Sequence, residues 1–510
     1  MKKYIIALFA ACSMLTSCDM DVANPGVEDD ITAVQGAKEL LACRNGLYSQ
    51  LRSLTSGSYV TSVELQMDQF NGVNGNGTRG AQIANGSINS SLGIAGDAFN
   101  GCYNIIANVN YMLGRADAII SGGSLTAEEL ADVERYIGEA KTIRGYVYFY
   151  LLDHFVQNPA TVDRNTEGLG MPIVDTYAPS GNPANYPGRS SVQALIDQIN
   201  GDLTAGYNAL AKYEQDNSVV CGANDSYLNT YVIKALQARM ALVLGDNNTA
   251  MTRASEVIAN TNYDLASGDA YVDMWTYDES DELIFVPYVD AAEYGTVGSF
   301  NDAWNFYQYM PTFSDYLPSF TTLMQYDVRN DIRFSTFFKA ADLSIAGSTY
   351  GAYQFMKFPG NPEIQGAASN RYRNKPKPFR LSEQYLILAE AAAIEGNTTV
   401  ANDALKTLRE HRIEGYTHTN LSGTELLEAV RQERTRELIG EGFRMSDLRR
   451  WGVGFTRDGE YPVNPSMEAN WVLAGLAVTY QPNDYRYVWP IPAAEIDINP
   501  QIAKQQNPGY

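Results

Sequence analysis

The amino-acid sequence of 510 residues predicts a mainly α-helical fold with long irregular loops and a few short strands. Apolar residues recur at helical spacing over long stretches toward both ends of the chain. Between Tyr263 and Arg371 this periodicity is faint, and Gly, Asn, Asp, Pro and aromatic residues alternate. A second stretch, Phe70 to Gly96, is rich in Asn, Gly and Ser. Because long loops in compact proteins are commonly functional or disordered, both stretches are candidates for a ligand-binding surface.

The first residues of the chain read as an export signal. A basic start, Met1-Lys2-Lys3, precedes an apolar stretch too short to span a bilayer, and Leu15-Thr16-Ser17-Cys18 follows. These last four residues resemble a bacterial lipobox, so we expect residues 1–17 to be a lipoprotein signal peptide and Cys18 to carry a lipid such as palmitate. The alternative is an ordinary signal with a chance cysteine. Lipid on Cys18 would be the only anchor, with Asp19 to Asp30 as an acidic, flexible tether.

The balance of charge excludes several classes of partner. The chain has 37 basic and 59 acidic side chains, a formal net charge of -22. Nucleic acid and anionic headgroups are therefore excluded as main partners, since phosphates are bound by clustered Lys and Arg. Three histidines leave little material for a multi-histidine metal site, and the sequence indicates neither a metal nor another cofactor. The 34 tyrosines suit a wet, polar binding surface.

The cysteines of the mature chain do not indicate a disulfide scaffold. Besides Cys18, they are Cys43, Cys102 and Cys221. At most one disulfide can form among these three, and the sequence leaves open whether two of them pair. We expect all three to be small buried apolar residues.

Two helices are clear before position 220. Thr126 and Glu129 form a capping-box pattern, which opens a run of apolar residues at helical spacing as far as Phe155. Ser191 to Leu210 is a second amphipathic helix. Toward the other end, Ser422-x-x-Glu425 is a further capping-box pattern, for a helix that runs to about Ile439.

Two later helix pairs resemble each other. In both, alanines stand 12 positions apart across a Gly-Asp or Gly-Asn turn, and the offset between the pairs is constant: Ala238, Ala241, Gly245, Ala250 and Val257 match Ala389, Ala392, Gly396, Ala401 and Leu408. This spacing resembles the tetratricopeptide helix pair, in which small residues let two helices pack closely. The chain then divides into a helical scaffold, about 31–262 and 372–452, a loop-rich aromatic insert, about 263–371, and an extended tail, 453–510.

Motifs for catalysis are mostly missing. Gly75 to Gly80 matches Gly-x-Gly-x-x-Gly, but no buried strand precedes it and no clear helix follows, so we interpret it as accidental. The acidic pairs Asp278-Glu279 and Asp281-Glu282 could serve a glycosidase, yet a solvated turn is the simpler expectation. Asp281 to Pro287 itself reads as a short strand.

A dense charged run occupies residues 431–452. Glu433 and Arg436 are i,i+3 neighbours that can pair on one helix face. We interpret the run as an ion-pair latch between helices rather than a ligand site, and we expect Arg436 and Glu437 to serve stability.

The predicted ligand surface lies in the aromatic insert. Residues 301–309 place aromatic rings among amides and an acid with no amphipathic period. Exposed rings of this kind stack on flat apolar ligand faces, while amides and charges meet hydroxyls. The predicted contacts are Trp304, Tyr307 and Tyr309, with Trp275 as a second platform and Asp68, Asn74 and Arg79 as polar partners.

Three blocks of the chain are distinctive: Arg-Gly-Tyr-Val-Tyr-Phe-Tyr-Leu at 144–151, the charged run from Glu433 to Gly452, and a tail with Trp-Pro-Ile-Pro at 489–492 and Gln-Asn-Pro-Gly-Tyr at 506–510. Together they resemble the SusD/RagB family of outer-membrane nutrient-binding lipoproteins. The chain departs from the family pattern at Gly145, where Ala is usual, and at Phe155-Val156, where the family has Tyr-Gly.

The resemblance implies a scaffold of four tetratricopeptide-like helix pairs in a single domain, residues 18–510. It also implies a lipoprotein on the exterior of the cell outer membrane that lids a SusC-like TonB-dependent transporter. The ligand would be an oligosaccharide, or in some members a peptide, and no bond would be cleaved. From the residues alone, a lipid-anchored glycoside hydrolase and a helical-repeat adaptor that binds protein remain open.

Overall fold

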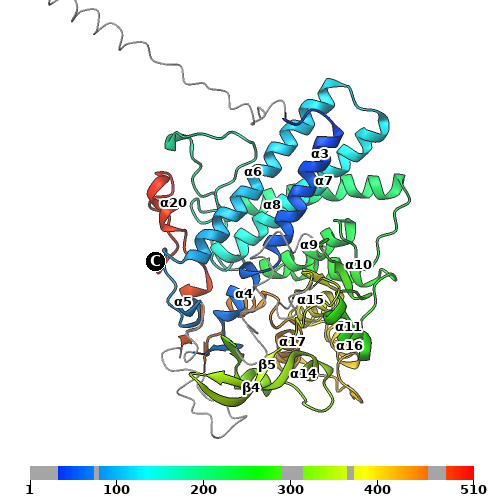
Figure 1. The fold of residues 1–510 in the computed structure, drawn as a ribbon, viewed down its shortest axis with the longest axis vertical. Helices are drawn as coiled ribbons and strands as arrows, with labels where there is room; N and C mark the ends of the chain where they lie inside the picture. The colour runs from blue at the N-terminus through cyan, green and yellow to red at the C-terminus, as the bar shows by residue number, and fades with distance from the viewer. Residues whose placement is uncertain (1–32, 74–79, 290–313, 365–372, 458–477) are drawn as a thin grey trace, which may run out of the picture.

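The computed structural model describes residues 33–73, 80–289, 314–364, 373–457 and 478–510 (Figure 1). The helices of eight or more residues are α3 (Ala37–Leu54), α4 (Ser58–Leu65), α6 (Gly93–Gly122), α7 (Ala127–Phe155), α8 (Val192–Asp216), α9 (Thr230–Leu244), α10 (Asn247–Ile258), α11 (Gly268–Tyr277), α15 (Leu381–Ile394), α16 (Thr398–Glu410), α17 (Gly423–Glu437) and α18 (Arg444–Trp451). The shorter ones are α5 (Ala81–Ala84), η2 (Pro183–Asn185), α13 (Phe320–Leu323), α14 (Ile332–Phe337), η4 (Tyr485–Tyr487) and α20 (Ala493–Ile498). The strands are β1 (Phe70–Gly72), β2 (Leu283–Phe285), β3 (Tyr316–Pro318), β4 (Phe338–Ile345), β5 (Ser348–Phe355), β6 (Phe379–Arg380), β7 (Phe455–Thr456) and β8 (Thr479–Tyr480).

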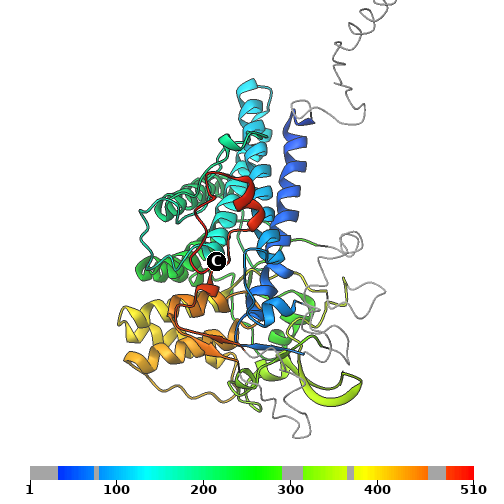
Figure 2. The ribbon, with the colours of Figure 1, turned by 90° about the vertical axis from the view of Figure 1, so that its left-hand side faces the viewer.

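Helices α3, α6 and α7 pack together along the long axis of the molecule, and α8 packs against α7 (Figures 1 and 2). The α7–α8 contact depends on glycine. A Cβ added at Gly138 would lie 2.7 Å from that of Ala209, and one added at Gly206 would lie 2.2 Å from Thr142 Oγ1. At Gly145 the same addition would lie 3.0 Å from Leu203, so the departure from the family's alanine falls on this interface.

The two predicted helix pairs are α9–α10 and α15–α16, and the mainly α-helical, tetratricopeptide-like fold is confirmed. The matched alanines are all buried, and α10 also packs against α15. Gly245 and Gly396 follow the first helix of their pairs with φ of +75° each, a conformation that favours glycine. Two pairs that share a contact therefore stack as one continuous block.

Of the two predicted capping boxes, one is present in the structure and the other is not. At α7, Thr126 accepts a hydrogen bond from the Glu129 amide, and the Glu129 carboxylate accepts from the Thr126 amide, so the predicted capping box is confirmed. Ser422 is the N-cap of α17, but its side chain makes no capping bond, because Gly423 begins the helix with φ of +55°. The sequence did not reveal α3 or the 30-residue α6.

The aromatic insert is more ordered than its weak periodicity predicts. Strands β4 and β5 pair in register from Phe338–Phe355 to Ile345–Ser348. Ala346 and Gly347 form the two-residue turn with φ of +50° and +83°. Ala-Gly is a weaker hairpin signal than Asn-Gly, which explains why the hairpin was not expected. Strand β2 lies within the predicted Asp281–Pro287 segment and pairs with β6.

The tail is docked rather than free. Trp489 is fully buried, and Asn507 donates hydrogen bonds to the carbonyls of Phe155 and Trp489 at 2.8 Å. Within the described ranges no helix has both the length and the apolar character that a membrane crossing needs. Cys43, Cys102 and Cys221 are unpaired thiols; Cys102 and Cys221 are buried as expected, while Cys43 is half-buried.

Candidate functional site

A short β-ladder brings two irregular segments of the chain to one place. Strands β1 and β3 are antiparallel, and the Val73 amide extends the ladder by donating to the Asp315 carbonyl at 2.7 Å. The segment 74–79 starts directly after Val73, and the segment 290–313 ends directly before Ser314. Both segments therefore join the ladder at the same end, although they are more than 200 positions apart in sequence. No sequence pattern could have predicted this pairing of three-residue strands.

Most of the predicted ligand contacts belong to these two segments. They lie outside the described residues, and their role stays a prediction: Asn74, Arg79, Trp304, Tyr307 and Tyr309. The ladder nevertheless relates the two groups, because the segments that carry them share an attachment point.

Asp68, just before the ladder, is held by an arginine that the sequence did not indicate. Arg444, at the start of α18, donates to both carboxylate oxygens of Asp68 at 2.7 Å. Burial alone would raise the pKa of Asp68, but the Arg444 guanidinium outweighs it and the pKa is lowered. The Asp68 side chain keeps 24% exposure, so it remains an ionised group that anchors the approach to β1 and presents one edge to solvent.

Asn71, within β1, is a second residue that the sequence did not single out. Its side chain is fully buried, and no described residue bonds to its amide oxygen or nitrogen. An unpartnered buried amide costs about 1–3 kcal/mol. Asn71 lies opposite Leu317 in the middle of the ladder, so this unpartnered amide is inside the protein and not at the end where the two segments join.

Trp275 does not lie where the sequence predicts. It was expected to be an exposed stacking platform, but its side chain is fully buried. Lys357, Lys377 and Arg380 lie 4.5, 5.3 and 5.0 Å from its ring centroid, and Phe337 and Phe358 contact it edge-on. Cation–π and edge contacts already occupy the ring, so in this conformation no sugar can stack on it.

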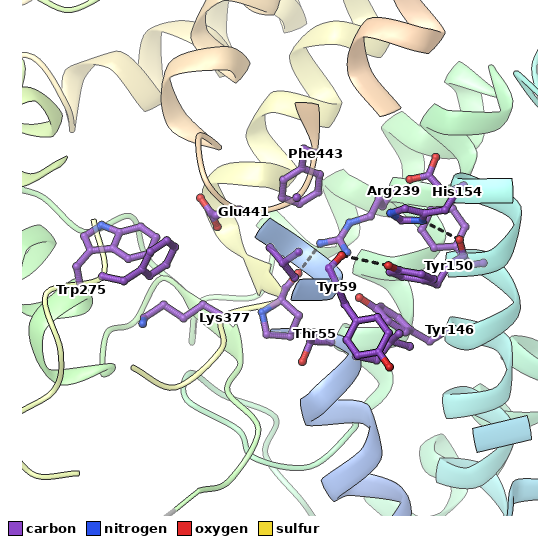
Figure 3. Close-up of a pocket in the computed structure, with 17 residues that line it drawn as sticks. Thr55, Tyr59, Tyr146, Tyr150, His154, Arg239, Trp275, Lys377, Glu441 and Phe443 are labelled. Atoms are coloured by element: carbon purple, nitrogen blue, oxygen red, sulfur yellow. Dashed lines mark hydrogen bonds between the residues drawn. The ribbon is translucent and has the colours of Figure 1, made fainter. Parts of the chain in front are cut away.

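Trp275 instead lies at one end of a small cavity between the scaffold and the insert (Figure 3). The opposite end is formed by Tyr150 and His154, whose rings stack at 3.9 Å. Burial lowers the pKa of His154, so its ring is neutral at pH 7. The cavity measures ≈ 80 Å³, whereas ligand pockets are typically about 300–1,000 Å³. It has room for a few waters and not for an oligosaccharide.

A buried set of ion pairs lies behind this cavity, and we call it the arginine–glutamate cluster. Its members are Arg333, Arg380, Arg412, Glu282, Glu433 and Glu437, all at 0–1% exposure. Burial alone would raise the pKa of Glu437, but Arg412, Arg380 and Arg333 hold it well below the usual range. The predicted Glu433–Arg436 pair is present at 2.6 Å. The cluster links α14 and α17 to β6, to the residue before β2 and to the turn after α16, which agrees with a latch.

One member of each acidic pair near position 280 is buried, whereas Glu279 and Asp281 are exposed as a solvated turn would have them. Asp278 is 1% exposed and bonds to Lys377, Asn361 and Asn374. Glu282 is fully buried and pairs with Arg380 and Arg412. The expectation of a solvated turn is therefore wrong for Asp278 and Glu282, because their partners lie 83 to 130 positions away and give no local signal.

The carboxyl group of Glu64, near Asp68, makes the free energy of unfolding of the protein depend on pH. Its carboxylate is fully buried and accepts hydrogen bonds from the amides of Gly440, Gly442 and Arg444. Burial raises its pKa to about 7, against an ordinary value of 4.5, and the three amides offset only part of this rise. A folded-state pKa above the unfolded one contributes stability at low pH, which is lost as pH rises toward 7.

We expect Glu64→Gln to remove this dependence. The wild-type free energy of unfolding, relative to the variant, should fall by about 2 kcal/mol between pH 5.5 and pH 8. Denaturant titrations of both proteins at several pH values measure it. A difference that stays constant across this range would show that Glu64 does not titrate there.

Among the described residues, no group of three or more His, Cys, Asp or Glu side chains is arranged to hold a metal ion.

Comparisons with known proteins assign the chain to a family. Residues 305–510 match a model of the SusD family, and residues 44–225 match a model described as starch-binding and associating with the outer membrane. The chain belongs to the SusD/RagB family. Only residues 1–43 and 226–304 of this SusD family member fall outside the two matches.

Solved structures agree with this assignment at the level of the fold. A SusD superfamily protein from Bacteroides thetaiotaomicron is 24% identical with a TM-score of 0.75, covering 93% of this chain and 100% of that one. A SusD-like carbohydrate binding protein from Bacteroides vulgatus is 20% identical, with a TM-score of 0.72 and coverage of 92% and 98%. A laminarin binding SusD-like protein is 20% identical, with a TM-score of 0.65 and coverage of 93% and 99%. No curated protein matches this SusD family member significantly.

Proposed function

We propose that this chain is a surface-exposed, glycan-binding lipoprotein of the outer membrane. The signal peptide, residues 1–17, is removed, and residues 18–510 form a single SusD-like domain anchored through lipid on Cys18. The protein captures an oligosaccharide and delivers it to a SusC-like TonB-dependent transporter, without cleaving it.

Given that the chain belongs to the SusD/RagB family, one structural observation supports glycan binding most strongly. In the β1–β3 ladder Val73, which precedes residues 74–79, bonds to Asp315, which follows residues 290–313. We infer that amides and rings from these two segments contact one ligand. Sugars present flat C–H faces to rings and hydroxyls to amides and charges.

The state of the nearby carboxylates supports binding over cleavage. A glycosidase needs a protonated carboxyl as general acid and a second carboxylate across the scissile bond. The pKa of Asp68 is lowered, with Arg444 opposing the effect of burial, so Asp68 is ionised at pH 7. The Glu64 carboxyl has a raised pKa, but it is fully buried against backbone amides. The test below also shows whether the protein is instead a hydrolase or a protein-binding adaptor.

The test is affinity electrophoresis of the mature chain in gels that contain soluble starch, laminarin, levan or yeast mannan, with product analysis of the same mixtures. Retention by one polysaccharide without released sugar is the expected result. Released oligosaccharide would favour a hydrolase. No retention, with binding to a peptide digest instead, would favour a peptide-binding member, and binding to neither would favour an adaptor.

With the retaining glycan, we expect Trp304→Ala to weaken binding about 5- to 150-fold, since one stacked ring contributes about 1–3 kcal/mol. Calorimetry measures the affinity. Tyr227→Ala is the control, because it removes an exposed ring, 51% accessible, from the helical scaffold. Unchanged affinity in a normally melting Trp304→Ala protein would remove Trp304 from the site and direct attention to residues 68–79.

A further inference from the structure

An open groove lies away from the β1–β3 ladder. It has a volume of ≈ 590 Å³, within the range of ligand sites, and we call it the C-terminal groove. Its walls come from three distant parts of the chain: residues 157–162 after α7, residues 449–452 at the end of α18, and residues 483–488 with 507–508. The C-terminus, which borders it, lies midway along the molecule, whereas β4 and β5 lie at the lower end (Figures 1 and 2).

An exposed aromatic ring is held in a fixed position at this groove. Tyr485 is 44% exposed, yet the ring of Tyr510 packs edge-on against it at 5.0 Å. The Tyr510 hydroxyl is itself fixed by a 2.8 Å hydrogen bond to the Val488 carbonyl. Gly509, with φ of +96°, approaches so closely that a Cβ there would lie 2.4 Å from the Tyr485 ring. An exposed ring that is already ordered loses little entropy when a ligand stacks on it.

A second ring is part of the wall. Trp451 is half-buried, and its indole N–H donates to Glu390 at 2.6 Å, which fixes the orientation of the ring. The groove therefore includes one exposed and one partly exposed aromatic side chain, both held by their neighbours.

Side-chain amides lie beside these rings. Asn483 is exposed and has φ of +58°, and Gln157 is half-buried on another wall. Neither side-chain amide bonds to a residue that the structure describes. Each amide can donate and accept, which is what a sugar hydroxyl requires.

The charges around the groove are neutralised in pairs. Arg449 bonds to Asp153 at 2.5 Å and Arg450 to Glu390 at 2.6 Å, while Asp484 is paired with Arg486 at 2.8 Å. A ligand in this groove meets no uncompensated charge from these residues. Fixed rings, uncommitted amides and balanced charge together favour a neutral saccharide over an acidic or basic peptide.

We propose that the C-terminal groove is a second saccharide site, for a neutral stretch of the same polysaccharide that the ladder end binds. The class of ligand rests on the proposed function, whereas the place rests on the groove alone. Two separated sites on one chain raise the affinity for a long polysaccharide, because binding at one site raises the effective concentration at the other. Short oligosaccharides cannot gain in this way.

The test is calorimetry on the detergent-solubilised mature chain, with laminarin and soluble starch as polymers and laminarihexaose and maltoheptaose as short probes. Tyr485→Ala should weaken binding of the retaining polymer about 5- to 150-fold. Asn483→Gly should also weaken it, because glycine keeps the left-handed backbone and removes only the amide. Tyr485→Phe is the matched control: it keeps the ring and should bind like wild type.

The results for these variants distinguish binding at the C-terminal groove from binding at the end of the β1–β3 ladder. Polymer affinity unchanged in both Tyr485→Ala and Asn483→Gly, with Trp304→Ala impaired, would overturn the groove and leave the proposed function standing. Weakened Tyr485→Ala with normal Trp304→Ala would support the groove and overturn the ladder end. Wild type that none of the four polysaccharide gels retains would overturn the groove together with the proposed function.

Discussion

Replacing Glu437 by glutamine should lower the free energy of unfolding by about 3–5 kcal/mol. The Glu437 carboxylate is fully buried and lies 3.0 Å from Arg412, 2.9 Å from Arg380 and 3.1 Å from Arg333. Neutralising it leaves three buried guanidinium groups with less compensating charge, in a place that water cannot reach. Denaturant unfolding followed by circular dichroism, at pH 7, measures the change.

Glu410→Gln is the matched control for this variant. Glu410 also pairs with a cation, Lys406 at 3.1 Å, but the two side chains are 43% and 46% exposed. Exposed pairs contribute about 0–1 kcal/mol, so this variant should unfold nearly like wild type. Arg436, whose side chain is 12% exposed and bonds to Glu433, should have an intermediate effect. If Glu437→Gln cost no more than Glu410→Gln, or lost glycan binding at normal stability, the latch interpretation would be wrong.

Replacing Cys18 by alanine should release the protein from the membrane completely. The expected lipid on Cys18 is the anchor, and within the described residues no helix is able to cross a bilayer. Flotation of cell membranes, with detection of the protein in each fraction, measures the change. Ser17→Ala is a suitable control, because it keeps a small residue before the cysteine. A Cys18→Ala protein that still floats in cells without the transporter would contradict the lipobox prediction.

The helical scaffold was predictable because its signals are local. The capping box at Thr126 and the alanine register around Gly245 and Gly396 involve residues at most about 20 positions apart in sequence, and the structure confirms them. Helix α6 was missed because it begins in the Gly- and Asn-rich stretch, where Gly93 and Gly96 weaken any helical pattern.

The binding region was less predictable because its contacts are long-range. Strands β1 and β3 are each three residues long, too short to show a period, and they pair residues more than 240 positions apart. The arginines around Glu437 are likewise scattered over the chain. Aromatic content alone does not separate a binding ring from a core ring, and for that reason Trp275 was placed on the surface although cations and rings enclose it.

The most direct measurement is a crystal structure of the mature chain bound to an oligosaccharide of the polysaccharide that retains it. We predict an intact glycan between the segments that join the β1–β3 ladder, with Trp304 stacked on a sugar ring. A glycan found only elsewhere on the molecule, or a cleaved product next to a carboxylate pair, would contradict it.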